Sequence, residues 1–582
     1  MTTTTLPVSK TRSFSTVFLI EMWERFGYYG MQALIVYYMV ERLGFADHRA
    51  TLTWGAAAAL IYVSPAFGGW VGDKILGTRR TMLMGAMVLA LGYALMSIPG
   101  QSVWFLFCSL GVIVVGNGLF KANAGNLVRK IYEGDDSKID SAFTIYYMAV
   151  NVGSMISQLL TPWIKDYVNA HYGSELGWHA AFAVCCVGLI VGLFNYLAMR
   201  HTLKHIGSEP DHHRVNMSKL GLVLLCGVAA VFISAYILQY ENVARIFVYA
   251  AAATVLGIFV YLISKSEKSE RAGLAAALVL TIQTVFFFIF YQQMSTSLNL
   301  FALRNVDLTF NLFGWTPFAW SPAQFQAFNP IWIFILSPIL ALIYTRASKG
   351  KGDLSVAAKF ALGFVAVAIG FFVYSAAGYM TTEPGRTSWW IMWWGYGFGA
   401  LGELLVSGLG LAMIARYVPA RMGGFMMGAY FVASGVSQYL GGVVSTIASV
   451  PNSIKDIVAN TSAPVVAQVQ ASYPAIMSLS LEDFRKWIEG AKKAGEIATQ
   501  AHLPTFSSLP QGTQAMLHQF NEQLFTTTMP TYTSLFFWLG VAGVICTLFA
   551  LAVLPLMKRL DAQHYQHNKG TDTPLPTIGS EE

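Results

Sequence analysis

Charge is scarce in this sequence. Only 12% of its 582 residues are Asp, Glu, Lys or Arg, whereas 55% are hydrophobic. Soluble domains carry roughly 25% charged residues, so this composition excludes an ordinary soluble protein and indicates an integral membrane protein. The net charge of +7 then implies no nucleic-acid partner, because Lys and Arg gather in the cytoplasmic loops of membrane proteins.

Cysteine and catalytic motifs are also scarce. The five cysteines all lie inside apolar runs: Cys108, Cys185, Cys186, Cys226 and Cys546. They show no disulfide framework or metal spacing, so we expect small packing residues. The H-E-x-x-H pattern and the nucleophile elbow are missing, and no filter-like sequence repeats as in a channel. We therefore expect no enzyme and no cofactor; a membrane enzyme acting on lipids or peptides and a channel are the rival classes.

Long apolar runs recur along the chain instead. Each has about 20 residues or more, enough to cross a hydrocarbon core of roughly 30 Å, and their Gly and Ala allow close helix packing. We predict fourteen membrane-spanning helices: 15–43, 52–76, 80–99, 103–126, 139–165, 178–200, 217–240, 244–264, 273–300, 326–346, 356–380, 388–416, 422–448 and 531–557. The predicted fold class is an all-α integral membrane protein.

The loops between these spans alternate in composition. Loops on one side, such as GDKILGTRR and SKSEKSER, carry most of the Lys and Arg, and the short loops on the other side carry few. The positive-inside rule places the basic loops in the cytoplasm. Both termini then lie in the cytoplasm.

Twelve of the predicted spans divide as six plus six around the remaining pair, which is the plan of secondary transporters with a substrate site between two halves. The predicted domains are an N-terminal tail (1–14), a six-helix bundle (15–200), a linker with a peripheral two-helix hairpin (201–272), a second six-helix bundle (273–557) and a C-terminal tail (558–582).

A polar insert, 451–529, interrupts the second bundle. Its stretch LEDFRKWIEGAKKAGEIA has amphipathic helical spacing, which predicts a soluble extracytoplasmic segment. Its residues indicate no chemistry. Capping the outer opening and docking a partner are the two roles that we consider for it.

Charged residues interrupt the first apolar run, where EMWERFGYYG follows FSTVFLI. At about 100° per residue, Glu21, Glu24, Arg25, Tyr28 and Gln32 fall within one stripe of a helix. An unpaired charge at mid-bilayer costs about 2.5–3.5 kcal/mol, and pairing offsets part of that cost. One interpretation is a salt bridge that only fixes helix packing. We favour the other, a titratable site that faces a hydrated central cavity.

Further polar residues lie inside other spans. Lys121 comes near the end of the fourth span, Tyr147 and Asn151 share a face of the fifth, and Asn329 lies near the start of span 326–346. Polar residues inside membranes commonly bond neighbouring helices. Taken singly, the Tyr and the two Asn fit that structural role better than a role as ligands.

Glu403 is harder to explain by packing. It is the only acid in span 388–416, and Ser407 follows it one turn later. No basic residue occurs in that span before its cytoplasmic end. An acid in that setting either stays protonated or meets a cationic partner.

These motifs resemble those of a known family. EMWERFGYYG matches the E-x-x-E-R-F-x-Y-Y pattern of the proton-dependent oligopeptide transporters, within the major facilitator superfamily, and FTIYYMAVNVGSM matches that family's fifth-helix signature. GGWVGDKILG and GELLVSG look like two further family motifs. The resemblance runs from about 15 to 557, with 451–529 outside it. It implies the major facilitator fold, with a hairpin similar to that of bacterial members, in the bacterial inner membrane.

The resemblance implies a role for each matching residue. Arg25 and Lys121 would face the carboxylate of a bound peptide, and Glu403 would face its protonated amino terminus. Glu21 and Glu24 would couple proton movement to Arg25. The remaining substrate-binding residues would be Tyr28, Tyr29, Gln32, Tyr62, Asn151, Asn329 and Ser407.

Proton-coupled import of dipeptides by alternating access is the implied function, with tripeptides as further candidates. The proton is the coupling ion, and no other cofactor is expected. Another small solute, such as nitrate, a sugar or a drug, is the alternative for the same architecture. We expect peptide and membrane lipid as partners, no nucleic acid, and function as a monomer.

Two departures from the family pattern bear on the coupling. Gln32 stands where many members have Arg, which removes a positive charge near the implied carboxylate pocket. Tyr291 and Gln292 stand where many members carry an acid. Any coupling scheme must therefore depend on the acids of the first span and on Glu403.

Overall fold

The structure, a computed structural model, describes residues 9–100, 102–173, 175–348, 355–406, 417–419, 422–490 and 493–568. These residues are mostly helical. The strands among them are short, β1 (Val306–Asp307), β2 (Thr381–Glu383) and β3 (Arg386–Ser388), and they pair in the order β1-β3-β2. The predicted all-α fold class is confirmed.

The long helices follow the predicted spans. The first half contains α1 (Lys10–Tyr37), α2 (Asp47–Val71), α3 (Thr78–Met96), α4 (Val103–Ile131), α5 (Asp136–His171) and α6 (Leu176–Met199). The hairpin contains α7 (Met217–Gln239) and α8 (Glu241–Lys265). The second half contains α9 (Lys268–Tyr291), α10 (Ser297–Asn305), α11 (Phe328–Ser348), α12 (Val356–Ser375), α13 (Trp390–Val406), α15 (Gly423–Ser445) and α20 (Gln511–Asn568).

Shorter helices complete the described chain. The insert contains α16 (Ile454–Ile457), α17 (Pro464–Ser472), α18 (Leu481–Ile488) and α19 (Ala494–Gln500). Two π-helical turns are η1 (Tyr38–Arg42) and η2 (Gly72–Leu76). The 3-10 turns are η3 (Arg200–Leu203), η4 (Glu209–His212), η5 (Gln292–Ser295), η6 (Pro322–Ala327), η7 (Ala376–Tyr379), η9 (Thr446–Ala448), η10 (Pro474–Ser478) and η11 (Phe506–Ser508).

Ten helical segments of the described chain are long and apolar enough to cross a membrane: Asp47–Leu76, Val103–Ile131, Leu176–Leu203, Met217–Gln239, Glu241–Lys265, Glu270–Asn305, Pro322–Ile343, Val356–Tyr379, Met426–Ala448 and Gln511–Gln563. The other predicted spans coincide with α1, α3, α5 and α13. The charged residues inside α1 lower its apolar character, and α13 is described only as far as Val406. The total of fourteen crossings stays a prediction.

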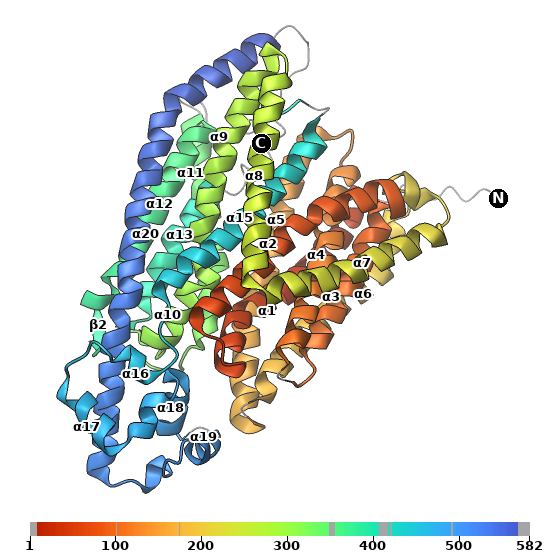
Figure 1. The fold of residues 1–582 in the computed structure, drawn as a ribbon. Helices are drawn as coiled ribbons and strands as arrows, with labels where there is room; N and C mark the ends of the chain where they lie inside the picture. The colour runs from red at the N-terminus through yellow and green to blue at the C-terminus, as the bar shows by residue number, and fades with distance from the viewer. Residues whose placement is uncertain are drawn as a thin grey trace.

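The helices form two groups that lie side by side (Figure 1). In the first group, red to orange in the figure, α1 packs against α5 and α6, and α4 packs against α2 and α3. In the second, green to blue, α12 packs against α13 and α20, and α9 packs against α15 and α20. We call these groups the first and the second bundle.

The α7–α8 hairpin lies outside both bundles. α7 packs against α4 of the first bundle, and α8 packs against α15 and α9 of the second. Only 22% and 17% of the apolar stretches of α7 and α8 are buried. Apolar surface that the protein leaves uncovered suits contact with lipid.

Small residues hold the two bundles together along α2 and α15. A Cβ on Gly442 would stand 2.8 Å from the carbonyl oxygen of Thr51, and a Cβ on Gly435 would stand 2.7 Å from that of Ala59. Both distances are too short for a real side chain. The glycines therefore let the backbones of the two helices touch, as in other closely packed membrane helices.

The insert packs around the start of α20, at the lower left of Figure 1. Phe484 and Trp487 of α18 are fully buried, and Phe484 meets Phe520 of α20 edge to face, with ring centroids 5.6 Å apart. The predicted amphipathic stretch forms two helices, because Gly490 with φ 66° follows α18. α20 then runs unbroken past the predicted insert boundary, with Pro530 inside it. We call the side of the molecule that carries the insert the insert end.

The contact between α2 and α4 predicts a steric limit at Gly68. A Cβ there would lie 1.9 Å from the carbonyl oxygen of Gly118, so Gly68→Ala forces the helices apart. We expect a loss of about 1–3 kcal/mol of stability, measured as a lower Tm in detergent. Gly257→Ala in α8 is the control, because its Cβ would meet nothing within 4 Å. Equal Tm values for the two variants would show that the α2–α4 contact is not tight.

Candidate functional site

The charged residues of α1 form a buried ion-pair cluster. Arg25 donates from Nε and Nη2 to the two carboxylate oxygens of Glu24, with Nη2 at 2.7 Å. Oε1 of Glu21 lies 3.7 Å from Nε of Arg25. All three side chains are buried, with Glu24 fully so. The guanidinium is thus held between two acids from its own helix, which offsets the cost of burying it.

Asn117 of α4 completes this cluster. Its Oδ1 accepts from Nη2 of Arg25 at 2.9 Å, and its Nδ2 donates to the carbonyl oxygen of Ile61 at 3.0 Å. One amide therefore joins α1, α2 and α4. The ring of Tyr28 lies under the guanidinium, 4.7 Å from it, in the geometry of a cation–π contact.

Lys121 lies one turn further along α4. Its Nζ is 4.8 Å from the ring centroid of Tyr62, and no carboxylate of the described chain lies within 4.0 Å of it. Oε2 of Glu21 likewise has no hydrogen-bond partner in the part of the chain that the structure describes. The cluster thus combines one tightly held cation with one that lacks an ion pair.

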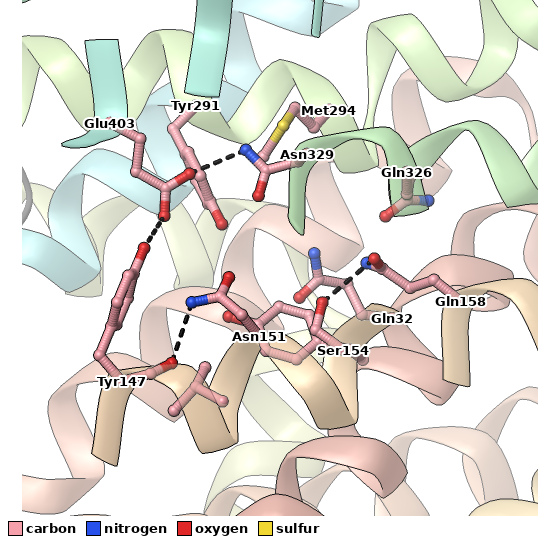
Figure 2. Close-up of a pocket in the computed structure, with 12 residues that line it drawn as sticks. Gln32, Tyr147, Asn151, Ser154, Gln158, Tyr291, Met294, Gln326, Asn329 and Glu403 are labelled. Atoms are coloured by element: carbon pink, nitrogen blue, oxygen red, sulfur yellow. Dashed lines mark hydrogen bonds between the residues drawn. The ribbon is translucent and has the colours of Figure 1, made fainter. Parts of the chain in front are cut away.

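Glu403 of α13 lies in a polar cavity between the bundles. Its Oε1 accepts from the hydroxyl of Tyr147 at 2.9 Å, and its Oε2 accepts from Nδ2 of Asn329 at 2.8 Å (Figure 2). Tyr147 belongs to the first bundle and Asn329 to the second. The carboxylate is therefore one point at which hydrogen bonds from both halves converge.

Residues of α1, α5, η5, η6, α9, α11 and α13 contribute to the wall of this cavity. Its lining is Tyr29, Gln32, Tyr147, Val150, Asn151, Ser154, Gln158, Tyr291, Met294, Gln326, Asn329 and Glu403. Gly153 brings α5 close to α1, because a Cβ there would meet the carbonyl oxygen of Met22 at 2.2 Å. The polar face of α5 is thereby fixed beside that of α1.

The predicted site residues fall into two adjacent groups. Those on the cavity wall are Tyr29, Gln32, Asn151, Asn329 and Glu403. Those in the charged cluster are Glu21, Glu24, Arg25, Tyr28, Tyr62 and Lys121. Tyr29 connects the groups, since its ring centroid lies 6.0 Å from the Arg25 guanidinium. Ser407 lies outside the described residues.

Three buried amides of these groups were not predicted from the sequence: Asn117, Gln158 and Gln326. Gln158 lines the cavity and accepts from Ser154 at 3.1 Å, and Gln326 donates to Oδ1 of Asn299 at 2.9 Å. Each is a buried amide in or beside an apolar run. Such an amide must find a partner inside the protein, and that requirement was the available signal.

The fold and the cavity together define a class of protein. Two helical bundles of a membrane protein enclose polar groups at their interface, and charged residues of both bundles lie beside this space. That arrangement is typical of secondary carriers, which move a solute by exposing an interfacial site to either side of the membrane.

Comparison with known proteins then gives the family. The model of the POT family matches residues 79–462, which is about two thirds of the chain. The chain belongs to the POT family. It is thus an integral membrane transporter of the bacterial cell membrane and not an enzyme.

Several relatives are similar over most of their length. Dipeptide and tripeptide permease B of Aliivibrio fischeri is 42% identical over 450 residues, 77% of this chain and 88% of that protein. The permease of the same name from Salmonella typhimurium is 42% identical over 446 residues, 76% of this chain and 88% of its own. Among solved structures, tetrameric PepTSo2 is 58% identical with a TM-score of 0.75, over 95% of this chain and 100% of that one.

A further solved structure is described as a bacterial homologue of the human drug peptide transporters PepT1 and PepT2. It shares 58% identity and a TM-score of 0.75, over 95% of this chain and 100% of that one. The match extends beyond the family model, because it covers nearly the whole chain. The major facilitator architecture expected from the sequence is thereby confirmed.

Proposed function

We propose that this protein imports dipeptides, with tripeptides as further candidate substrates, together with protons. The observation that carries this proposal is the position of Glu403, an acid on the cavity wall that receives hydrogen bonds from both bundles. Arg25 and Lys121 lie beyond Tyr29, in the charged cluster beside this cavity. The printed names of the relatives favour peptide over nitrate, a sugar or a drug.

A zwitterionic peptide fits this distribution of charge. Glu403 binds its ammonium group, and Arg25 and Lys121 bind its carboxylate. The backbone of a dipeptide spans about 7 Å, so a peptide can contact groups of both bundles at once. Since such contacts exist only when the halves are close, substrate binding favours closure of the bundles around it.

The Arg25–Glu24 pair provides the coupling to protons. With Glu24 ionised, the guanidinium is engaged by Glu24 and Asn117 and is less available to a peptide carboxylate. Protonation of Glu24 releases it, and the unpartnered oxygen of Glu21 offers a second place for the proton. One charge moving down 100 mV supplies about 2.3 kcal/mol, enough for roughly 50-fold accumulation.

The proposal includes an orientation and a functional unit. The insert end faces the extracytoplasmic side and both termini face the cytoplasm, which is supported by the basic loops. The bundles 15–200 and 273–557 move relative to each other, with 201–272 outside them. Both bundles that contribute described residues to the cavity wall belong to one chain, which supports the monomer as the functional unit; the tetramer in the PepTSo2 description is a property of that protein.

Neutralising the buried acid tests the coupling. Glu24→Gln removes the charge that holds Arg25 while keeping the side-chain shape. We expect the variant to lose proton-driven dipeptide uptake in proteoliposomes while retaining counterflow exchange. Glu133→Gln, at an exposed position, is the control and keeps both activities. Normal gradient-driven uptake by Glu24→Gln would contradict the coupling scheme.

A second substitution tests recognition of the amino terminus. Glu403→Gln keeps a polar group in the cavity but removes the charge that pairs with the ammonium group. We expect affinity for free dipeptides to fall by about tenfold or more, and affinity for N-acetylated dipeptides to change little. Binding is measured by calorimetry on purified protein. Equal affinity of the unmodified protein for free and N-acetylated dipeptides would remove Glu403 from this role.

A further inference from the structure

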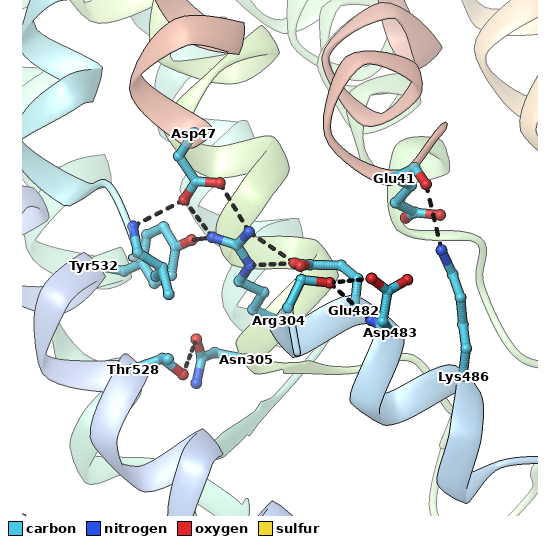
Figure 3. Close-up of polar contacts among 11 residues, drawn as sticks. Glu41, Asp47, Arg304, Asn305, Glu482, Asp483, Lys486, Thr528 and Tyr532 are labelled. Atoms are coloured by element: carbon cyan, nitrogen blue, oxygen red, sulfur yellow. Dashed lines mark hydrogen bonds and ion pairs between the residues drawn. The ribbon is translucent and has the colours of Figure 1, made fainter. Parts of the chain in front are cut away.

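One arginine at the insert end joins three parts of the chain. Arg304 of α10 bonds both carboxylate oxygens of Asp47, at the start of α2, with Nη2 to Oδ1 at 2.8 Å (Figure 3). It also donates to Oε1 of Glu482 in α18, from Nε at 2.9 Å and from Nη2 at 2.7 Å. The hydroxyl of Tyr532 accepts from Nη1 at 2.9 Å. The second bundle, the first bundle and the insert thus share one buried guanidinium.

Glu482 is ionised in this network. Its burial would raise the pKa of the carboxyl, but the adjacent charge and hydrogen bonds of Arg304 outweigh that effect and hold the pKa below its ordinary value. A charge-assisted bond between buried partners is stronger than one in solvent. Loss of the negative charge on Glu482 would therefore weaken the link between the insert and the two bundles.

The insert also reaches the first bundle directly. Lys493 forms an ion pair with Glu175, whose other oxygen lies 2.6 Å from Nη2 of Arg42. Lys486 donates to the carbonyl oxygen of Glu41 at 3.4 Å (Figure 3). Glu41, Arg42 and Glu175 all lie at the insert end of the first bundle, near the ends of α1 and α5.

The same insert is attached to the second bundle at both of its ends. It follows α15 and leads into the unbroken helix α20, and the buried ring of Phe484 in α18 packs on Phe520 of α20. The insert must therefore move with the second bundle. When the bundles separate at this end, its contacts with Asp47, Glu175 and Glu41 break.

We propose that the insert is a clamp on the outer face of the transporter, with Glu482 as the residue that sets its strength. This inference rests on the proposed alternating access. Contacts made in only one of two conformations shift the balance between them. The clamp stabilises the state that is closed at the insert end, and every opening of the outer face has to release it.

A distance measurement across the outer face tests the clamp. Spin labels at Tyr172→Cys and Tyr379→Cys, two exposed positions of the first and second bundles, report how far the bundles separate. The exposed native Cys226 is replaced by Ser. The distances are measured on the full chain in nanodiscs, without peptide. The labelled protein with Glu482 intact is compared with the labelled Glu482→Gln variant.

We expect Glu482→Gln to raise the ratio of open to closed outer faces about tenfold. Glu496→Gln, an exposed acid of the same insert, leaves the ratio unchanged. Identical distributions for these two variants would overturn the clamp. Should Glu482→Gln fail to fold, Lys493→Gln decides the question, with an expected shift of about twofold because its ion pair is partly exposed.

The same samples separate this inference from the proposed function. The distances are measured without peptide, so they test the clamp whatever the substrate is. A shifted distribution in a protein that takes up no peptide would support the clamp and contradict peptide import. An unshifted distribution in a protein that does take up peptide would contradict the clamp and support peptide import.

Discussion

Burying charge inside a membrane is costly, and the structure depends on how it meets that cost at Arg25. The guanidinium is bonded to Glu24 and Asn117, with Glu21 close by, so a cation can lie buried in the middle of α1. A pair of this kind is stable only while both partners are charged. In the coupling that we propose, that condition makes the pair sensitive to a proton.

The remaining polar groups follow from the same constraint. A polar group without a hydrogen-bond partner costs on the order of several kcal/mol in the apolar interior. Polar side chains therefore gather where two bundles can share them. Glu403 takes its donors from α5 and α11, and Arg304 takes its acceptors from α2 and α18. At the same interface, glycines let α2 and α15 touch. The interface therefore combines close contact with a few shared charges that can separate.

Local sequence patterns predicted a large part of this arrangement. The long helices lie on the predicted spans, the stripe on α1 is a paired cluster, and Glu403 stood out as the only acid of its span. The pairings between distant segments were not predictable: Arg304 and Glu482 are 178 residues apart, and Tyr147 and Glu403 are 256 apart. Sequence shows that a buried charge needs a partner, but only the fold decides which one. For the same reason, the amphipathic pattern of the insert indicated a helix without showing that the insert contacts both bundles.

Uptake into proteoliposomes with an imposed pH gradient, acid outside, tests the account most directly. With a labelled dipeptide, the account predicts accumulation above the external concentration, which collapses when an ionophore dissipates the gradient. Unlabelled dipeptides should compete, and nitrate or sugars should not. Uptake that only brings the internal dipeptide concentration to the external one, or that does not depend on the pH gradient, would contradict proton-coupled peptide import.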